Sequence, residues 1–276
     1  MYPKTLGFEE RTVYYRESDC FSAAPMHLVH AYLHPDYTMR MHRHQFCEIN
    51  VILGGEGMHY IGENSLPARV GDVFIIPPEV AHGYASHGAL DIGHVLLRAD
   101  FFARYREELA QLPGFSLLFD IEPQVRRSSG LDCNLCIPAH ELPRVREVGK
   151  QMIRAEGEGL FAYENVLTLG LVGKLGELLR QSALPTQAGD LLRVMEFIKG
   201  NLEQKLTLEM LAQRANMSKS TLSRHFREVL HASPMQYVLQ CRLAKARELL
   251  ATAVQNKSEI AQACGFFDVS HMNKYL

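Results

Sequence analysis

Apolar residues in the first third of the chain come in short runs that turn residues separate. Between about residues 12 and 97 these runs are alternating or β-branched, as in INVIL at 49–53 and VFII at 73–76, with GGEG, GENS and PPEVAHG between them. Side chains alternate faces along a strand, so such runs predict the strands of a small antiparallel barrel or sandwich. Pro77 and Pro78 must lie at a strand end, because proline cannot donate a ladder hydrogen bond.

The apolar period changes to that of a helix after residue 100. Phe101, Phe102, Tyr105 and Leu109 are at helical spacing, and the segment 141–181 predicts an antiparallel helix pair. The second helix of this pair is apolar on more than one side, which predicts that it packs on the barrel and also on a second subunit of a homodimer. The alternative is that this helix is buried wholly within one chain.

The last third of the chain has a helical pattern throughout and follows a linker. SALPTQAG at 182–189 is rich in proline, glycine and small residues, which is typical of a linker. We therefore predict an α+β chain with two domains. A small antiparallel β-barrel or sandwich occupies residues 1–140 and is followed by the helix pair at 141–181, and an all-α domain occupies residues 190–276.

The segment 206–226, LTLEMLAQRANMSKSTLSRHF, has the pattern of a helix-turn-helix. Thr207 can cap a first helix and Ser218 a second, whose core face is Leu222 and Phe226. The outer face of the second helix can reach base edges or phosphates when it lies in a major groove, and it carries Lys219, Ser220, Ser223, Arg224 and Arg227. A charged face that is only solvated is the alternative.

A similar signature follows at 257–276, KSEIAQACGFFDVSHMNKYL, where CGFFD forms the turn and a new helix begins at about Val269 or Ser270. The amphipathic segment between the two signatures predicts a helix that holds them rigidly apart. Two such units on one rod can reach two successive segments of the major groove of double-stranded DNA.

Charge and histidine are distributed unevenly along the chain, whose net charge is −2. Residues 190–276 have 12 Lys and Arg against 8 Asp and Glu, a charge of +4, while residues 1–189 have 17 against 23, a charge of −6. A basic end favours an anionic partner. Nine of the thirteen histidines lie between His27 and His94. We therefore expect the N-terminal and C-terminal parts of the chain to have different functions.

The bulk composition, 47% hydrophobic and 22% charged residues, is that of a globular protein. No stretch approaches the roughly 20 apolar residues that a membrane span needs, and the first residues have no signal-peptide pattern, so we expect a cytoplasmic protein with no membrane partner. The only close cysteine pair is Cys133 and Cys136, which we interpret as plain turn or core thiols, with a redox or accessory metal role as the alternative.

The segment 206–250, followed by IAQACGFFDVSHMNKYL, resembles the DNA-binding domain of AraC-type transcription regulators. The resemblance covers about 85 residues and implies a seven-helix domain with two DNA-reading units, placed after a sensor domain. It implies the following contacts to operator DNA: Ser220, Thr221, Ser223 and Arg224 from the first unit, and Ser270, His271, Asn273 and Lys274 from the second. In that family the second recognition helix continues past the position of Leu276, so we expect this sequence to be truncated.

Two histidines and a glutamate stand at 42–48 in the pattern H-x-H-x3-E, and Gly55 follows. His42 and His44 point to the same face of a strand, and Glu48 has the same parity. With Gly71, Pro77 and His82, these residues resemble the two motifs of the cupin barrel, over roughly residues 20–97. The resemblance implies a β-barrel of jelly-roll type. Glu79 and Ser86 depart from the pattern, which usually has glycine and asparagine there.

Three imidazoles and a carboxylate suit a divalent Zn, Ni, Fe, Mn or Co ion better than Ca, so His42, His44, Glu48 and His82 are a candidate metal site. Polar lining of a ligand pocket without metal, or histidines satisfied in the core, are the alternatives. The further pocket candidates are Arg40, Tyr60, Glu79 and Tyr84. We interpret His27, His30, His34 and His59 as surface or strand-packing residues.

Together these features predict a one-component transcription regulator rather than an enzyme. The cupin pocket is expected to bind a small-molecule effector, a sugar or related carbon source, and to control operator binding by a homodimer, which would contact RNA polymerase if it is an activator. The alternative is a metal-dependent cupin enzyme, a dioxygenase or sugar isomerase. An enzyme of this kind would have no use for the basic C-terminal region with its two helix-turn-helix units.

Overall fold

The computed structural model describes residues 13–35, 39–62, 64–112, 114–121, 123, 135–181, 186–230, 232–252 and 256–276. By contacts the chain divides into two compact units, Met1–Ala183 and Leu184–Leu276. Within the described ranges, none of the helices has the length and apolar character needed to cross a bilayer. The predicted α+β class with two domains is confirmed.

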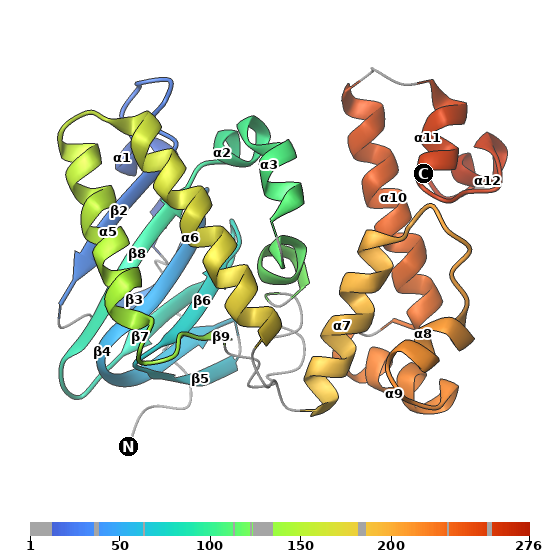
Figure 1. The fold of residues 1–276 in the computed structure, drawn as a ribbon, viewed down its shortest axis with the longest axis horizontal. Coiled ribbons are helices and arrows are strands. Elements are labelled where there is room, and N and C mark those ends of the chain that lie inside the picture. Colours follow the sequence, from blue (N-terminus) through green and yellow to red (C-terminus); the bar gives the residue numbers. More distant parts are fainter. Residues whose placement is uncertain are drawn as a thin grey trace. The chain divides into compact units, whose positions relative to one another are not determined.

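The first unit is built on strands that curl into a half-barrel (Figure 1). They are β1 (Val13–Tyr15), β2 (Val29–His34), β3 (Met39–His44), β4 (Cys47–Ile61), β5 (Asn64–Arg69), β6 (Asp72–Ile76), β7 (His82–Ala85), β8 (Leu90–Leu97) and β9 (Leu135–Cys136). One side of the half-barrel pairs β1, β3, β7, β4 and β5, and the other pairs β2, β8, β4, β6 and β9. The long strand β4 belongs to both sides.

Strand β4 passes from one side to the other through a β-bulge. Ile52 pairs with Ile92 but Gly54 pairs with Asp91, so two residues of β4 oppose one of β8. Gly55 then adopts a φ of +77°, and a Cβ there would lie 1.7 Å from the carbonyl oxygen of Ala89. Glycine is required at this bend because any side chain would clash with β8.

Helices cover one side of the half-barrel. Short segments precede them, namely α1 (Glu17–Cys20), α2 (Ala99–Arg104), α3 (Arg106–Gln111) and the π-helical turn η1 (Leu117–Ile121). Helices α5 (Leu142–Gly157) and α6 (Phe161–Gln181) then lie side by side across β2 and β8 (Figure 1). Leu171, Val172 and Leu175 of α6 are buried, whereas Tyr163 and Val166 are 50% and 59% exposed. Helix α6 therefore keeps an apolar edge that is not covered within the described chain.

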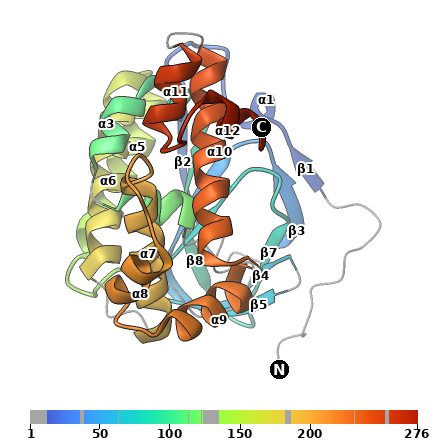
Figure 2. The same ribbon diagram turned by 90° about the vertical axis from the view of Figure 1, so that its right-hand side faces the viewer.

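The second unit consists of helices around a central rod. They are α7 (Thr186–Gly200), α8 (Leu208–Arg214), α9 (Lys219–Leu230), α10 (Pro234–Thr252), α11 (Lys257–Ala263) and α12 (Val269–Asn273). Figure 2 shows α10 running between the pair α8–α9 at one end and the pair α11–α12 at the other. A helix between the two helix-turn-helix signatures is predicted from the sequence, and the structure has it as α10.

The two helix pairs of the second unit repeat one turn geometry. In each turn the left-handed residue is Asn216 or Gly265, with φ of 52° and 74°. The next amide, from Met217 or Phe266, donates to a carbonyl five residues earlier. Thr207 and Ser218 cap α8 and α9 as the sequence predicts, and Asn256 and Asp268 cap α11 and α12.

Candidate functional site

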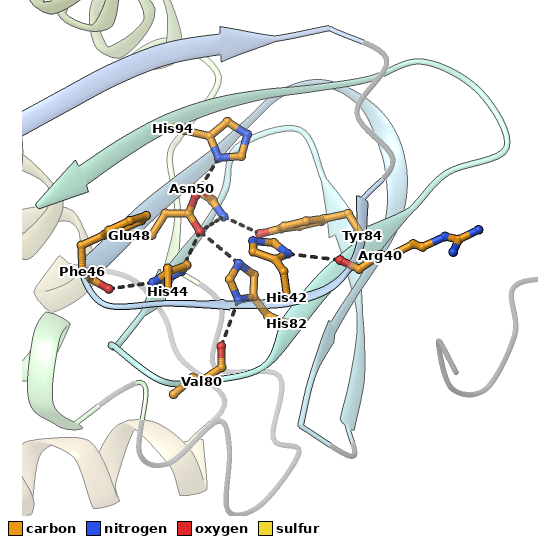
Figure 3. Close-up of polar contacts among 10 residues, drawn as sticks. All are labelled: Arg40, His42, His44, Phe46, Glu48, Asn50, Val80, His82, Tyr84 and His94. Carbon is orange, nitrogen blue, oxygen red and sulfur yellow. Dashed lines mark hydrogen bonds and ion pairs between the residues drawn. The ribbon is translucent and has the colours of Figure 1, made fainter. Parts of the chain in front are cut away.

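Three buried histidines of the half-barrel share one hydrogen-bonding arrangement (Figure 3). The Nδ1 atom of His42 lies 3.1 Å from the carbonyl oxygen of Arg40, that of His44 lies 2.7 Å from Phe46, and that of His82 lies 3.1 Å from Val80. A carbonyl oxygen can only accept a hydrogen bond, so each Nδ1 carries a proton. When such a ring is neutral, its Nε2 presents a free lone pair.

Glu48 is the centre of this cluster. Its Oε2 lies 3.0 Å from His82 Nε2 and 3.4 Å from His44 Nε2, and its Oε1 accepts from His94 Nδ1 at 2.9 Å. Asn50 Nδ2 donates to the same carboxylate at 3.2 Å and to the Tyr84 hydroxyl at 3.0 Å. The site therefore joins β3, the first half of β4, β7 and β8.

Electrostatics favour an ionised Glu48 carboxylate beside a neutral His42 imidazole. Burial alone would raise the pKa of Glu48, but the imidazoles of His44, His82 and His94 outweigh it and hold this pKa well below its usual range. Burial, together with repulsion from His82, lowers the pKa of His42 to about 3. Burial also lowers the pKa of His94, although Glu48 opposes this. His42 is consequently neutral at pH 7.

The donor set fits a divalent transition metal. One ligating atom from each of His42, His44, Glu48 and His82 lies within 4.8 Å of the others, and all four residues are buried. His44 Nε2 has no hydrogen-bond partner in the part of the chain that the structure describes. Nδ1–H groups fixed by carbonyl oxygens are the usual support of metal-binding imidazoles, because they set the tautomer and the ring orientation.

Two residues of this cluster are absent from the sequence-based candidates. Asn50 is fully buried. It stands two residues after Glu48 on the same strand, and this spacing predicts that both side chains lie on the inner face. His94 pairs with Asn50 across β4 and β8, a relationship that depends on strand register. Tyr84 was predicted in the pocket and binds Asn50 there.

The prediction for Tyr60 is wrong. Tyr60 packs with Met41 and Ala81, on the face of the sheet opposite to His42 and His82. The bulge at Gly54 reverses the parity of β4, so that His59 takes the inner position, stacked on Tyr84 with ring centroids 4.6 Å apart. His59 was interpreted as a surface or strand-packing residue, and it is fully buried.

The predicted pocket position is also wrong for two other residues, Arg40 and Glu79. The side chain of Arg40 is exposed and points away from the cluster (Figure 3). A register shift between Met39 and His42 removes Arg40 from the inner face of β3. Glu79 is exposed and accepts a hydrogen bond of 2.6 Å from Tyr14. Its φ of +65° shows why glycine suits that position of the motif.

The predicted DNA-contacting residues lie on the second helix of each helix-turn-helix pair. Arg224 on α9 is 62% exposed and forms a weak ion pair with Glu228 at 3.5 Å. The other candidates on α9 are at least partly exposed, and those on or just after α12 are exposed: Lys219, Ser220, Thr221, Ser223, Arg227, Ser270, His271, Asn273 and Lys274. Base contact itself stays a prediction.

Two smaller features lie outside the histidine cluster and the helix-turn-helix pairs. Cys133 lies outside the described residues, and burial raises the pKa of the Cys136 thiol, which disfavours the thiolate needed for redox chemistry. A cavity of about 30 Å³ between β2, β8 and α5 is lined by Leu53, Val145 and Ile153.

Comparisons with known proteins address both units. A family model described as an AraC-like ligand binding domain matches residues 25–137, and one described as a helix-turn-helix domain matches residues 211–276. The HTH-type transcriptional activator RhaR of Enterobacter sp. (strain 638) is 23% identical over 94% of this chain and 90% of its own length. The HTH-type transcriptional regulator GbdR of Pseudomonas aeruginosa is 28% identical over 69% of this chain and 50% of its own.

Among solved structures, an AraC-type DNA-binding regulator from Chromobacterium violaceum is 29% identical, with a TM-score of 0.30, over 31% of this chain and 77% of that one.

A ligand-binding half-barrel joined to two helix-turn-helix pairs defines a one-chain, DNA-binding transcription regulator. The chain is an AraC-type regulator, with an AraC-like ligand-binding domain followed by an AraC-type helix-turn-helix domain. Its relatives are DNA-binding regulators rather than enzymes, and the enzyme alternative is therefore not retained.

Proposed function

We propose that the cluster of Glu48 and its histidines binds a small polyhydroxylated effector, a sugar or a related carbon source, and that this binding controls the affinity of the second unit for operator DNA. The observation that carries the proposal is the arrangement of Nε2 atoms around one buried carboxylate. Three rings have their Nδ1 atoms fixed by backbone carbonyls, which leaves their Nε2 atoms for the cluster. The Nε2 atoms of His44 and His82 lie 3.4 Å and 3.0 Å from Glu48 Oε2. Packing alone does not need this convergence.

The residues that would hold a divalent metal in this site are His42, His44, Glu48 and His82. Such an ion would supply a Lewis-acidic point for hydroxyl or carboxylate oxygens of the effector. The chain's own residues supply the orientation, because His94 and Asn50 hold both carboxylate oxygens of Glu48 in place. Tyr84 adds a hydroxyl on the same side through its bond with Asn50.

Dimerisation through α6 is the second part of the proposal. The exposed apolar edge at the start of this helix consists of Leu160, Tyr163 and Val166, which are 50%, 50% and 59% exposed. An apolar edge of this kind on a soluble domain favours a protein partner, and a second copy of the chain would place two DNA-binding units on one operator. An effector would alter operator affinity only to the extent that it binds the two arrangements differently.

The printed name of RhaR supports activation as the direction of control, since that relative is a transcriptional activator. Activation would require the DNA-bound dimer to contact RNA polymerase. A sugar as effector rests on the chemistry of the cluster, whose imidazole, carboxylate, amide and phenol groups offer the donors and acceptors that hydroxyl groups need.

The experiment that tests this function is an operator-binding titration with the full chain. A DNA site is first selected in vitro from random duplexes, and its affinity is then measured with and without each member of a sugar panel. We expect one class of sugar to change the affinity at least fivefold, which is the lower range of allosteric coupling, and His44→Ala to remove that response while keeping basal DNA affinity. A sugar response that survives in His44→Ala contradicts the assignment of the cluster.

A further inference from the structure

A second group of histidines lies outside the half-barrel cluster. His27 Nε2 lies 2.9 Å from Glu156 Oε1, and His30 Nδ1 lies 2.7 Å from the same oxygen. His27 precedes β2 and His30 lies within it, whereas Glu156 is in the last turn of α5. The three ligating atoms lie within 4.8 Å of one another. The sequence gives no hint of the group, because 126 to 129 residues separate the histidines from Glu156.

A buried carboxylate beside this group is unexplained by the fold. Glu164, in the first turn of α6, is fully buried. Within the described residues neither of its carboxylate oxygens has a hydrogen-bond partner. Burial, and then repulsion from Glu156, raises the pKa of Glu164 to about 8. An unpaired buried carboxyl group is costly, and a cation close by would lower that cost.

The turn between α5 and α6 is held firmly against this group. Phe161 stacks on the His27 ring with centroids 4.6 Å apart and an interplanar angle of 19°. Asn165 Nδ2 donates to the carbonyl oxygen of Met26 at 3.1 Å. The strand, the end of α5 and the start of α6 are therefore positioned together before any ligand arrives.

We propose that His27, His30 and Glu156 form a second site for a divalent transition metal of the zinc type, whose positive charge would favour ionisation of the buried Glu164 carboxyl group. Imidazole nitrogens with one carboxylate are a recognised ligand set for zinc, and such sites leave a position for water or a further ligand. Solvent can reach the group, since the side chains of His30 and Glu156 are 29% and 18% exposed. The site shares no residue with the cluster around Glu48 and does not depend on the proposed effector.

Ser22 supplies the support that a zinc-binding His27 would need. Its hydroxyl oxygen and its amide nitrogen each lie 2.8 Å from His27 Nδ1. In the metal-free chain the amide donates to Nδ1, so the proton of the neutral ring is on Nε2 and faces Glu156. Metal binding at Nε2 requires the ring proton to move to Nδ1, which then donates to the Ser22 hydroxyl, while the Ser22 amide must turn away because it can no longer donate to Nδ1. Loss of such an outer partner typically lowers metal affinity about 10- to 100-fold.

The test counts bound Zn(II) in the full chain. Wild type, His30→Asn and Glu156→Gln are dialysed against Zn(II) and analysed for bound metal, with His140→Asn as the matched control because that side chain is 77% exposed. We expect His30→Asn and Glu156→Gln each to lose one equivalent relative to wild type and to His140→Asn. Glu156→Gln keeps a hydrogen-bonding side chain of the same size, so it separates loss of a ligand from loss of the fold.

The two sites are distinguished by repeating the count in a His44→Ala background. We expect one equivalent to remain in His44→Ala and to disappear when His30→Asn is added. Ser22→Ala should keep the equivalent but weaken it about 10-fold or more. The proposal is overturned if His30→Asn and Glu156→Gln bind as much zinc as wild type, or if His44→Ala alone removes all bound zinc.

Discussion

His82 Nε2 lies 3.0 Å from Glu48 Oε2, while the other nitrogen of the same ring lies 3.1 Å from the carbonyl oxygen of Val80. Both contacts are with oxygen atoms that can only accept. His82 must therefore either carry a proton on each nitrogen or share a cation with Glu48. In either case the cluster holds charged groups in a buried region, where uncompensated charge is costly.

Removal of metal should destabilise the wild-type chain more than it destabilises His82→Gln, which keeps the group of His27, His30 and Glu156. If the cluster holds an ion at about 100 times its dissociation constant, binding contributes roughly 2.7 kcal/mol, and a chelator removes that contribution. The measurement is thermal unfolding of zinc-loaded protein with and without a chelator. His30→Asn, which leaves this cluster intact, is the control and should retain the chelator effect. An equal effect in His82→Gln would place the stabilising metal elsewhere.

Acid should destabilise the metal-free first unit through His42. Burial and His82 lower the pKa of His42 to about 3, whereas an unfolded histidine titrates near 6.5. Between these values the unfolded chain binds a proton that the folded chain does not. Stability is therefore full above about pH 6.5 and falls by about 1.4 kcal/mol per unit as the pH is lowered toward 3. Urea unfolding with chelator present, compared with His42→Gln, measures this, and identical slopes would contradict it.

Arg224→Ala should weaken specific DNA binding by about 1–3 kcal/mol if the guanidinium reads a base. Arg247→Ala is the matched control, because Arg247 is exposed on α10 and lies outside both helix-turn-helix pairs. The measurement is the affinity for a selected duplex over a range of salt concentrations. Affinity should fall steeply with salt, as counterion release requires. Unchanged affinity in Arg224→Ala would mean that this side chain only faces water.

Val166→Asp should dissociate the proposed dimer. The substitution places a charge on the exposed apolar edge of α6, where Val166 is 59% exposed in the single chain. Sedimentation equilibrium of the full chain should show a dimer for wild type and a monomer for the variant. Glu177→Ala, an exposed position farther along α6, should stay dimeric. A wild-type chain that sediments as a monomer would remove the dimer from the proposal.

The sequence predicts the elements of the fold well because their signals are local. Helix caps such as Thr207 and Ser218 act within three residues of their own position, and the structure has both. The pair His42 and His44 lies on one strand with Glu48 close by in sequence, so alternation alone brings these three side chains to one face.

The remainder of the site depends on irregularities and long-range register. A single bulge at Gly54 exchanges Tyr60 for His59 on the inner face, and a second shift near Arg40 turns that side chain outward. Such bulges leave only weak traces in the composition of a strand. His94 reaches Glu48 across 46 residues, and no pattern within either strand indicates this contact.

The most direct test of the central claim is thermal unfolding of the full chain against a panel of monosaccharides, disaccharides, uronic acids and aromatic acids, in wild type and in His44→Ala. One class should raise the melting temperature of wild type by several degrees, as roughly 2.7 kcal/mol of binding energy does, and leave His44→Ala unchanged. A shift of the same size in both proteins, or no shift with any class, would contradict an effector site at Glu48 and its histidines.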